Sequence, residues 1–126
     1  MNNVKQDFLS CATTYAIAME EVYEVENSPV DRKKHLKTAN QMIVKLKKIY
    51  KQAYLDNELS EIEELLCHEN KYVRCVAATY SLINNYDLAQ KVLNELLILP
   101  APNYVAPIAR LSLASWKKGL LNPDKI

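Results

Sequence analysis

The chain has 126 residues, of which 49% are hydrophobic and 25% are charged, and its net charge at pH 7 is +1. This composition is ordinary for a globular protein, and the length suits one domain that buries roughly two-thirds of its unfolded surface. Gly119 is the only glycine, which argues against hairpin-rich β-architectures and against phosphate-binding loops, since both need glycine. We therefore predict an all-α fold in a single domain, residues 1–126.

The cellular compartment is predicted from the absence of a membrane-spanning run and of a signal peptide, and from the number of cysteines. No uninterrupted apolar run reaches the roughly 18 residues of a membrane-spanning helix. The first residues, Met1 to Asp7, are polar and do not resemble a signal peptide. Cys11, Cys67 and Cys75 are an odd number without a CxxC pair, a pattern that favours a reducing compartment over a disulfide framework. We expect a cytoplasmic protein that does not interact with membranes.

Two long helices are predicted first and form an N-terminal pair over residues 1–55. Residues 4–24 carry apolar side chains at three- and four-residue spacing. The second helix should begin at Ser28, which can cap it, with Pro29 at its first position and Asp31 in its first turn. Its apolar stripe starts at Leu36, and it should end near residue 55.

Four shorter helices follow over residues 60–118. Ser60 and Glu63 have the spacing of a capping box and predict a third helix that ends near residue 67. Asn70 should cap the fourth helix, and a fifth should start at residue 85 or 87 and stop before Pro100. The sixth is predicted over 103–118, with Gly119 as a left-handed residue after it.

A repeated helix-pair pattern lies in this second half. Val73 and Val105 are 32 residues apart, as are Ala77 and Ala109. An offset of this length between two-helix units is typical of helical solenoids. It predicts two stacked helix pairs within 60–118, in which the small alanines let neighbouring helices lie close together.

The run from Leu65 to Arg74, followed by Ala77-Ala78 and Leu82, resembles a HEAT repeat, in which a Val-Arg pair opens the inner helix after a polar turn. With the ending from Ala114 to Gly119, the chain is similar to a small bacterial family of HEAT-like helical domains of unknown function. The resemblance implies a short α–α superhelix and supplies no active site, so we expect a protein that is not an enzyme. Several small bacterial helical-repeat proteins are immunity proteins that neutralise a toxin, which sets an expectation at the level of fold only.

Charge is strongly segregated along the chain. Residues 28–55 carry a net charge of +7 and residues 56–69 a net charge of −6. We predict that the acidic segment binds another protein, such as a basic nuclease-type toxin, through Asp56, Glu58, Glu61, Glu64 and Glu69. The simpler alternative is a solvated helix start, where acidic residues are favoured by the helix dipole.

The basic second helix offers an alternative function. Its residues Lys34, Lys37, Lys45, Lys48 and Lys51 could contact the phosphates of a nucleic acid. Against this stand the few aromatic residues available for base stacking and the possibility that the lysines only form a solvated, partly ion-paired face.

Neither a metal nor another cofactor is expected. Cys67, His68 and Cys75 lack the fourth ligand of a structural zinc site, and both cysteines fall on apolar stripes. No third group is evident to orient a Cys–His pair for catalysis. Arg74 is expected to tie adjacent helices together, and Trp116 to close the core.

Overall fold

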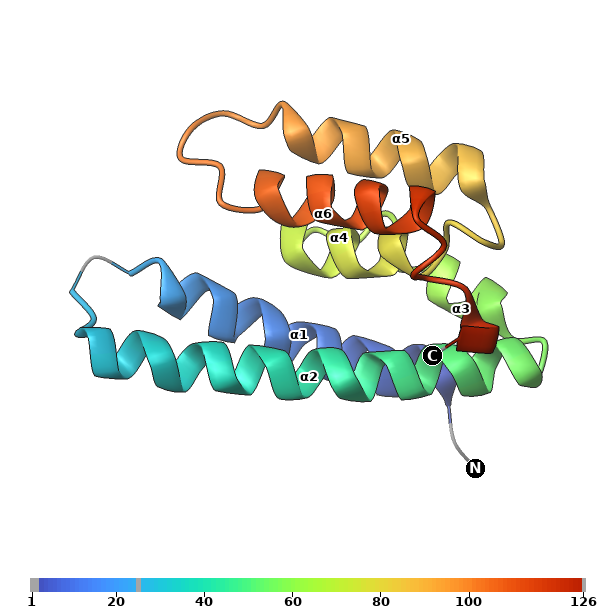
Figure 1. The fold of residues 1–126 in the computed structure, drawn as a ribbon, viewed down its shortest axis with the longest axis horizontal. Helices are drawn as coiled ribbons and strands as arrows, with labels where there is room; N and C mark the ends of the chain where they lie inside the picture. The colour runs from blue at the N-terminus through green and yellow to red at the C-terminus, as the bar shows by residue number, and fades with distance from the viewer. Residues whose placement is uncertain (1–2, 25, 126) are drawn as a thin grey trace.

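A computed structural model describes residues 3–24 and 26–125 as an all-helical protein with no strand in those ranges (Figure 1). This confirms the predicted all-α fold. Six α-helices and one short 3-10 helix follow in the order α1 (Val4–Val22), α2 (Pro29–Leu55), α3 (Leu59–Glu63), α4 (Lys71–Thr79), α5 (Tyr86–Leu97), α6 (Ala106–Lys117) and η1 (Pro123–Lys125).

Helices α1 and α2 form a long antiparallel pair on one side of the molecule (Figure 1). The Ser28 side chain accepts a hydrogen bond from the backbone N–H of Asp31, and the Asp31 carboxylate accepts one from the backbone N–H of Ser28. This capping box places the start of α2 at Pro29, as the sequence predicts. Fully buried Phe8 on α1 and Leu46 on α2 belong to the core.

Helices α4, α5 and α6 form the other side, and α4 joins the two sides because it contacts α1, α5 and α6 (Figure 1). Asn70 caps α4 by accepting hydrogen bonds from the backbone N–H groups of Tyr72 and Val73 at 2.8 and 3.2 Å. Between α4 and α6, the Thr79 hydroxyl lies 2.7 Å from the Ser112 hydroxyl. The two helices therefore lie side by side, as the repeat offset predicts.

The third helix differs from its prediction. It starts at Leu59 and ends at Glu63, and its N-cap residue, Glu58, makes no side-chain capping bond. Ser60 and Glu63 do not form the predicted capping box, because Ser60 lies inside α3 rather than at its N-cap. The Glu63 carboxylate accepts a hydrogen bond from the Asn84 side chain at 2.7 Å. Residues 64–67 form turns rather than more helix.

Two other boundaries shift inward. Helix α5 ends at Leu97, three residues before Pro100. Helix α6 begins at Ala106 rather than residue 103, since the Asn103 side chain holds the connecting loop: its amide donates to the carbonyl of Leu96 at 2.9 Å and its oxygen accepts from the N–H of Ala106 at 3.2 Å. Gly119 has φ of +74° and follows α6 as predicted.

Residues 119–125 leave α6 and return to α2, where η1 packs (Figure 1). The hydroxyl of Tyr50, a buried residue of α2, donates a hydrogen bond to the carbonyl of Leu121 at 2.9 Å. This contact links residues 71 positions apart and attaches the segment after α6 to the long N-terminal pair.

Candidate protein-binding surfaces

The acidic cluster, defined as Asp56, Glu58, Glu61, Glu64 and Glu69, occupies the turns around α3. Four of its side chains are exposed and Glu61 is half-buried. Because α3 has five residues, only Glu61 lies inside it, while Glu58 and Glu64 flank its two ends. The cluster is therefore a set of carboxylates around a single helical turn rather than a row along the face of one helix.

Little neutralises these carboxylates within the described chain. The Glu64 carboxylate lies 3.9 Å from the ammonium group of Lys5, with both side chains substantially exposed. The Asp56 carboxylate accepts a hydrogen bond from the Gln52 side chain at 3.0 Å. An exposed ion pair at this distance contributes little to stability, so the cluster presents its negative charge to solvent.

Arg74 stabilises the turn beside this cluster. Its guanidinium donates to the carbonyl oxygens of His68 and Glu69 at 2.8 and 3.0 Å. His68 accepts a hydrogen bond from the N–H of Asn70 through Nδ1 at 3.0 Å. Both side chains thus have structural roles in the turn before α4.

The basic face of α2 consists of Lys34, Lys37, Lys45, Lys48 and Lys51. The first four side chains are exposed and Lys51 is half-buried. Tyr50 is buried in the core and Tyr54 is 36% exposed, so of the two tyrosines on this helix only Tyr54 could stack on a base. The basic face therefore suits phosphate contact better than base recognition.

The cysteines suggest no shared site. Cys67 is exposed and Cys75 is fully buried. Burial raises the pKa of the Cys75 thiol to about 12, which keeps it protonated and unreactive at neutral pH. In the part of the chain that the structure describes, no three histidine, cysteine or acidic side chains are placed to hold a metal ion.

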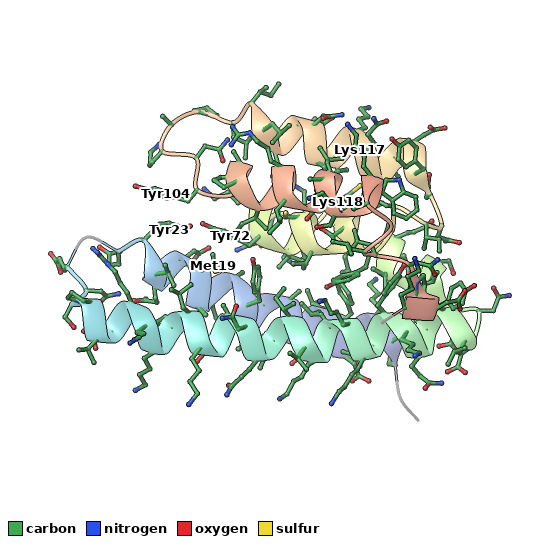
Figure 2. All side chains as sticks on the ribbon, in the orientation of Figure 1. Met19, Tyr23, Tyr72, Tyr104, Lys117 and Lys118 are labelled. Carbon is green, nitrogen blue, oxygen red and sulfur yellow. The ribbon has the colours of Figure 1, made fainter. Side chains whose placement is uncertain are left out.

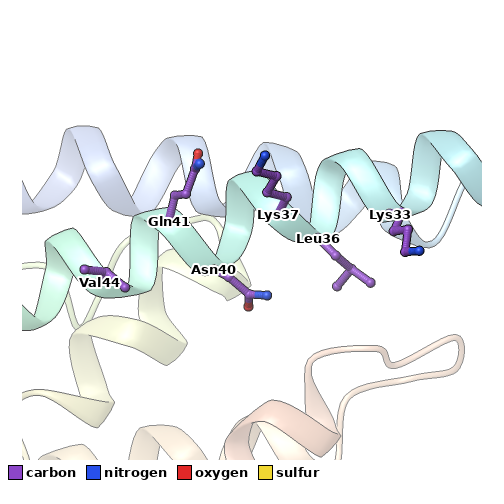
Figure 3. Close-up of a pocket in the computed structure, with 6 residues that line it drawn as sticks. All are labelled: Lys33, Leu36, Lys37, Asn40, Gln41 and Val44. Carbon is purple, nitrogen blue, oxygen red and sulfur yellow. The ribbon is translucent and has the colours of Figure 1, made fainter.

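An apolar groove between α2 and α6 was not found by sequence reasoning. It has a volume of about 350 Å³, and its walls include Leu36 and Ile43 of α2 and Ile108 and Leu111 of α6. The groove continues along α2 as a shallow depression, where Leu36 and Asn40 point toward the side on which α6 lies (Figure 3). Leu36 was predicted on the inward stripe but is 41% exposed, because α6 stands away from the first half of α2.

Aromatic pairs hold the two sides of the molecule together next to this groove. The rings of Tyr23, after α1, and Tyr104, before α6, stack with centroids 4.2 Å apart and nearly parallel planes (Figure 2). Tyr15 of α1 meets Tyr72 of α4 edge to face at 6.5 Å. A third pair lies within the α4–α6 side: Trp116 of α6 is half-buried beside Tyr86 of α5, with centroids 6.1 Å apart.

Within the described residues, no helix is long and apolar enough to span a membrane. No protein-family model matches the chain, and no curated protein or solved structure shows significant similarity to it.

Proposed function

We propose that this protein is a non-enzymatic module that binds another protein, as an immunity-type inhibitor of a bacterial toxin, with a nuclease-type toxin favoured. The observation that carries the proposal is the acidic cluster. Residues 56–69 include six acidic residues and no lysine or arginine, and four of the five cluster carboxylates are exposed. A surface of this kind complements a protein that normally attracts nucleic acid.

The acidic cluster would affect both the rate and the specificity of binding. Exposed charges of one sign accelerate encounter with an oppositely charged partner and fix its orientation. Pairs that become fully desolvated contribute most, and truncation of one partner in such a pair can cost several kcal/mol, whereas pairs at the rim mainly affect association. The HEAT-like resemblance adds the expectation of a bacterial inhibitor. Free thiols at Cys11, Cys67 and Cys75 support action in a reducing cytoplasm.

The test combines Glu58→Gln, Glu61→Gln and Glu64→Gln in one variant. The partner that the proposal requires is a toxin domain encoded beside this gene, and the readouts are its binding and the protection of cells that express it. We expect a strong loss of binding with the fold intact. A matched control changes Glu24, Glu26 and Glu95 to Gln, which removes the same charge from exposed positions elsewhere and should preserve protection.

Two outcomes contradict the proposal in different ways. If no neighbouring protein binds, the immunity function is wrong. If a toxin domain binds and the triple variant still protects cells, the function stands but the interface lies outside the acidic cluster.

The second candidate is a nucleic-acid-binding module that acts through the basic face of α2, favoured by its exposed lysines. We expect only weak, non-specific binding that falls steeply with salt. Micromolar or tighter binding at about 0.15 M salt, lost when Lys45, Lys48 and Lys51 are changed to Gln, would favour this candidate instead. The equivalent change of three lysines outside the face, at positions 91, 117 and 118, is the control for net charge.

A further inference from the structure

The groove between α2 and α6 is an open channel with an apolar floor. Ala39 of α2 and Val76 and Tyr80, within and just after α4, line it and are at least 96% buried. Above this floor the walls carry apolar side chains that face water: Leu36 is 41% exposed and Leu111 is 67% exposed. Exposed apolar side chains gathered along one groove are typical of a binding site rather than of scattered surface residues.

The polar groups of the groove already have structural roles or can reach solvent. The hydroxyl of Ser112 accepts from Thr79 at 2.7 Å and donates to the carbonyl of Ile108 at 3.1 Å. Asn40 and Ser115 lie at the edges, where they are exposed and half-buried. An occupant therefore meets apolar surface in the centre and hydrogen-bonding groups at the sides.

The charged side chains on the α2 side of the groove are basic. Residues 32–55 of the α2 wall and residues 96–123, which include the α6 wall, contain no aspartate or glutamate. Lys47 lines the groove itself, and Lys33 and Lys37 line the adjoining depression (Figure 3). Lys118 follows the end of α6 (Figure 2). An occupant that buries apolar groups here would place its α2-facing flank beside positive charge.

The length of the groove suits a helix. From Leu36 to Lys47 the α2 wall rises about 17 Å, or roughly three helical turns. Both walls are helices, and the described residues offer no strand edge to which an extended peptide could add. A helix lying between two helices inserts side chains at positions i, i+3 or i+4, and i+7, which is the established mode of helix-in-groove recognition.

We infer that this groove is a docking site for an amphipathic helix of a partner protein, with an apolar face that enters the groove and acidic residues along its flanks. The apolar walls supply affinity, and the lysines select acidic over basic flanks. The site is separate from the acidic cluster, so it is a second binding surface that adds to the proposed function.

The test uses the full-length protein and two fluorescent peptides of about 15 residues, enough for roughly four helical turns. Both carry leucines at positions i, i+3, i+7 and i+11; one has glutamates beside them and the other lysines. We expect the glutamate peptide to bind with a micromolar Kd in fluorescence anisotropy, and the lysine peptide to bind at least about tenfold more weakly.

Variants at the groove and matched controls locate the binding. Leu36→Glu and Leu111→Glu change exposed positions. Each should lower the affinity for the glutamate peptide at least about tenfold, since each adds a negative charge to an apolar wall. The controls are Leu88→Glu and Leu55→Glu, at positions that are 40% and 64% exposed but do not line the groove. They should leave the peptide affinity unchanged, with circular dichroism verifying the fold of all four variants.

Several results would overturn the inference. They are equal binding of both peptides, binding of neither, or glutamate-peptide binding that survives both groove variants. Binding to phosphatidylglycerol vesicles that the groove variants abolish, without peptide binding, would assign the groove to an anionic lipid surface instead. The triple Gln variant of the acidic cluster should still bind the glutamate peptide, so failure of the toxin proposal and failure of this inference are distinguishable.

Discussion

Replacing Ala77 by leucine tests whether α4 is packed on every side. Ala77 is 0% exposed, and its helix contacts α1, α5 and α6. The change adds three carbon atoms, which would stabilise the protein by roughly 2.4 kcal/mol if an empty space received them, at about 0.8 kcal/mol for each buried methylene. If the helices are in close contact, the added atoms instead force them apart at a cost of about 1–3 kcal/mol. We expect the loss.

Urea denaturation followed by far-UV circular dichroism gives the free energy of unfolding, and a loss of about 2 kcal/mol corresponds to roughly 8 °C in Tm for a chain of this size. The control is Ala114→Leu on α6, at an exposed position. Because alanine and leucine have similar helix propensities, the control should change stability by less than about 0.5 kcal/mol. If Ala77→Leu is neutral or stabilising, the helices around α4 are not closely packed at Ala77, and the assignment of Ala77 to the buried side of this helix is wrong.

Three further predictions concern the core. Tyr50→Phe should lower the free energy of unfolding by about 1–3 kcal/mol, because it leaves the carbonyl of Leu121 without its donor; urea denaturation measures this, and no change would mean that the bond contributes nothing. Ser81→Ala should raise the free energy of unfolding by about 1 kcal/mol, since the buried Ser81 hydroxyl has no hydrogen-bond partner among the described residues. A lower free energy of unfolding would show that the hydroxyl does have a partner. Burial raises the pKa of four core tyrosines, Tyr15, Tyr50, Tyr72 and Tyr80, so the unfolded state loses phenolic protons first as the pH rises through 10. Stability should therefore fall above about pH 10, by at most about 1.4 kcal/mol per pH unit for each group, and urea midpoints that do not differ between pH 9 and pH 11 would contradict this.

The sequence predicted helix starts well wherever a capping side chain acts locally. Ser28 and Asn70 cap α2 and α4 through hydrogen bonds to residues two or three positions away, so the local sequence is enough to predict these caps. The prediction at Ser60 was wrong, because α3 starts one residue before Ser60, which lies inside it. The Glu63 carboxylate is instead bound by Asn84, which lies 21 residues further along. No local pattern contains that information.

The candidate surfaces divide in the same way. Exposure of the acidic cluster could be expected from its charge, since a charged side chain is rarely buried without a partner. The groove could not be expected, because its walls come from helices that are distant in sequence and depend on how far α6 stands from α2. Two apolar residues hinted at it: Leu111 lies off the buried side of α6 and Leu36 lies at the margin of the α2 stripe. From the sequence alone, these two leucines cannot be distinguished from ordinary surface leucines.

The return of residues 119–125 to α2 has a consequence for the order in which the protein folds. The α1–α2 pair forms from neighbours in the chain, and contacts of this local kind form quickly. The bond from Tyr50 to Leu121 spans 71 residues, so the inner surface of α2 is complete only after α3 to α6 have been made and arranged. During synthesis, part of the apolar surface of the α1–α2 pair therefore stays exposed until the later helices have formed. In this interval a nascent chain is most prone to wrong association or to binding by a chaperone.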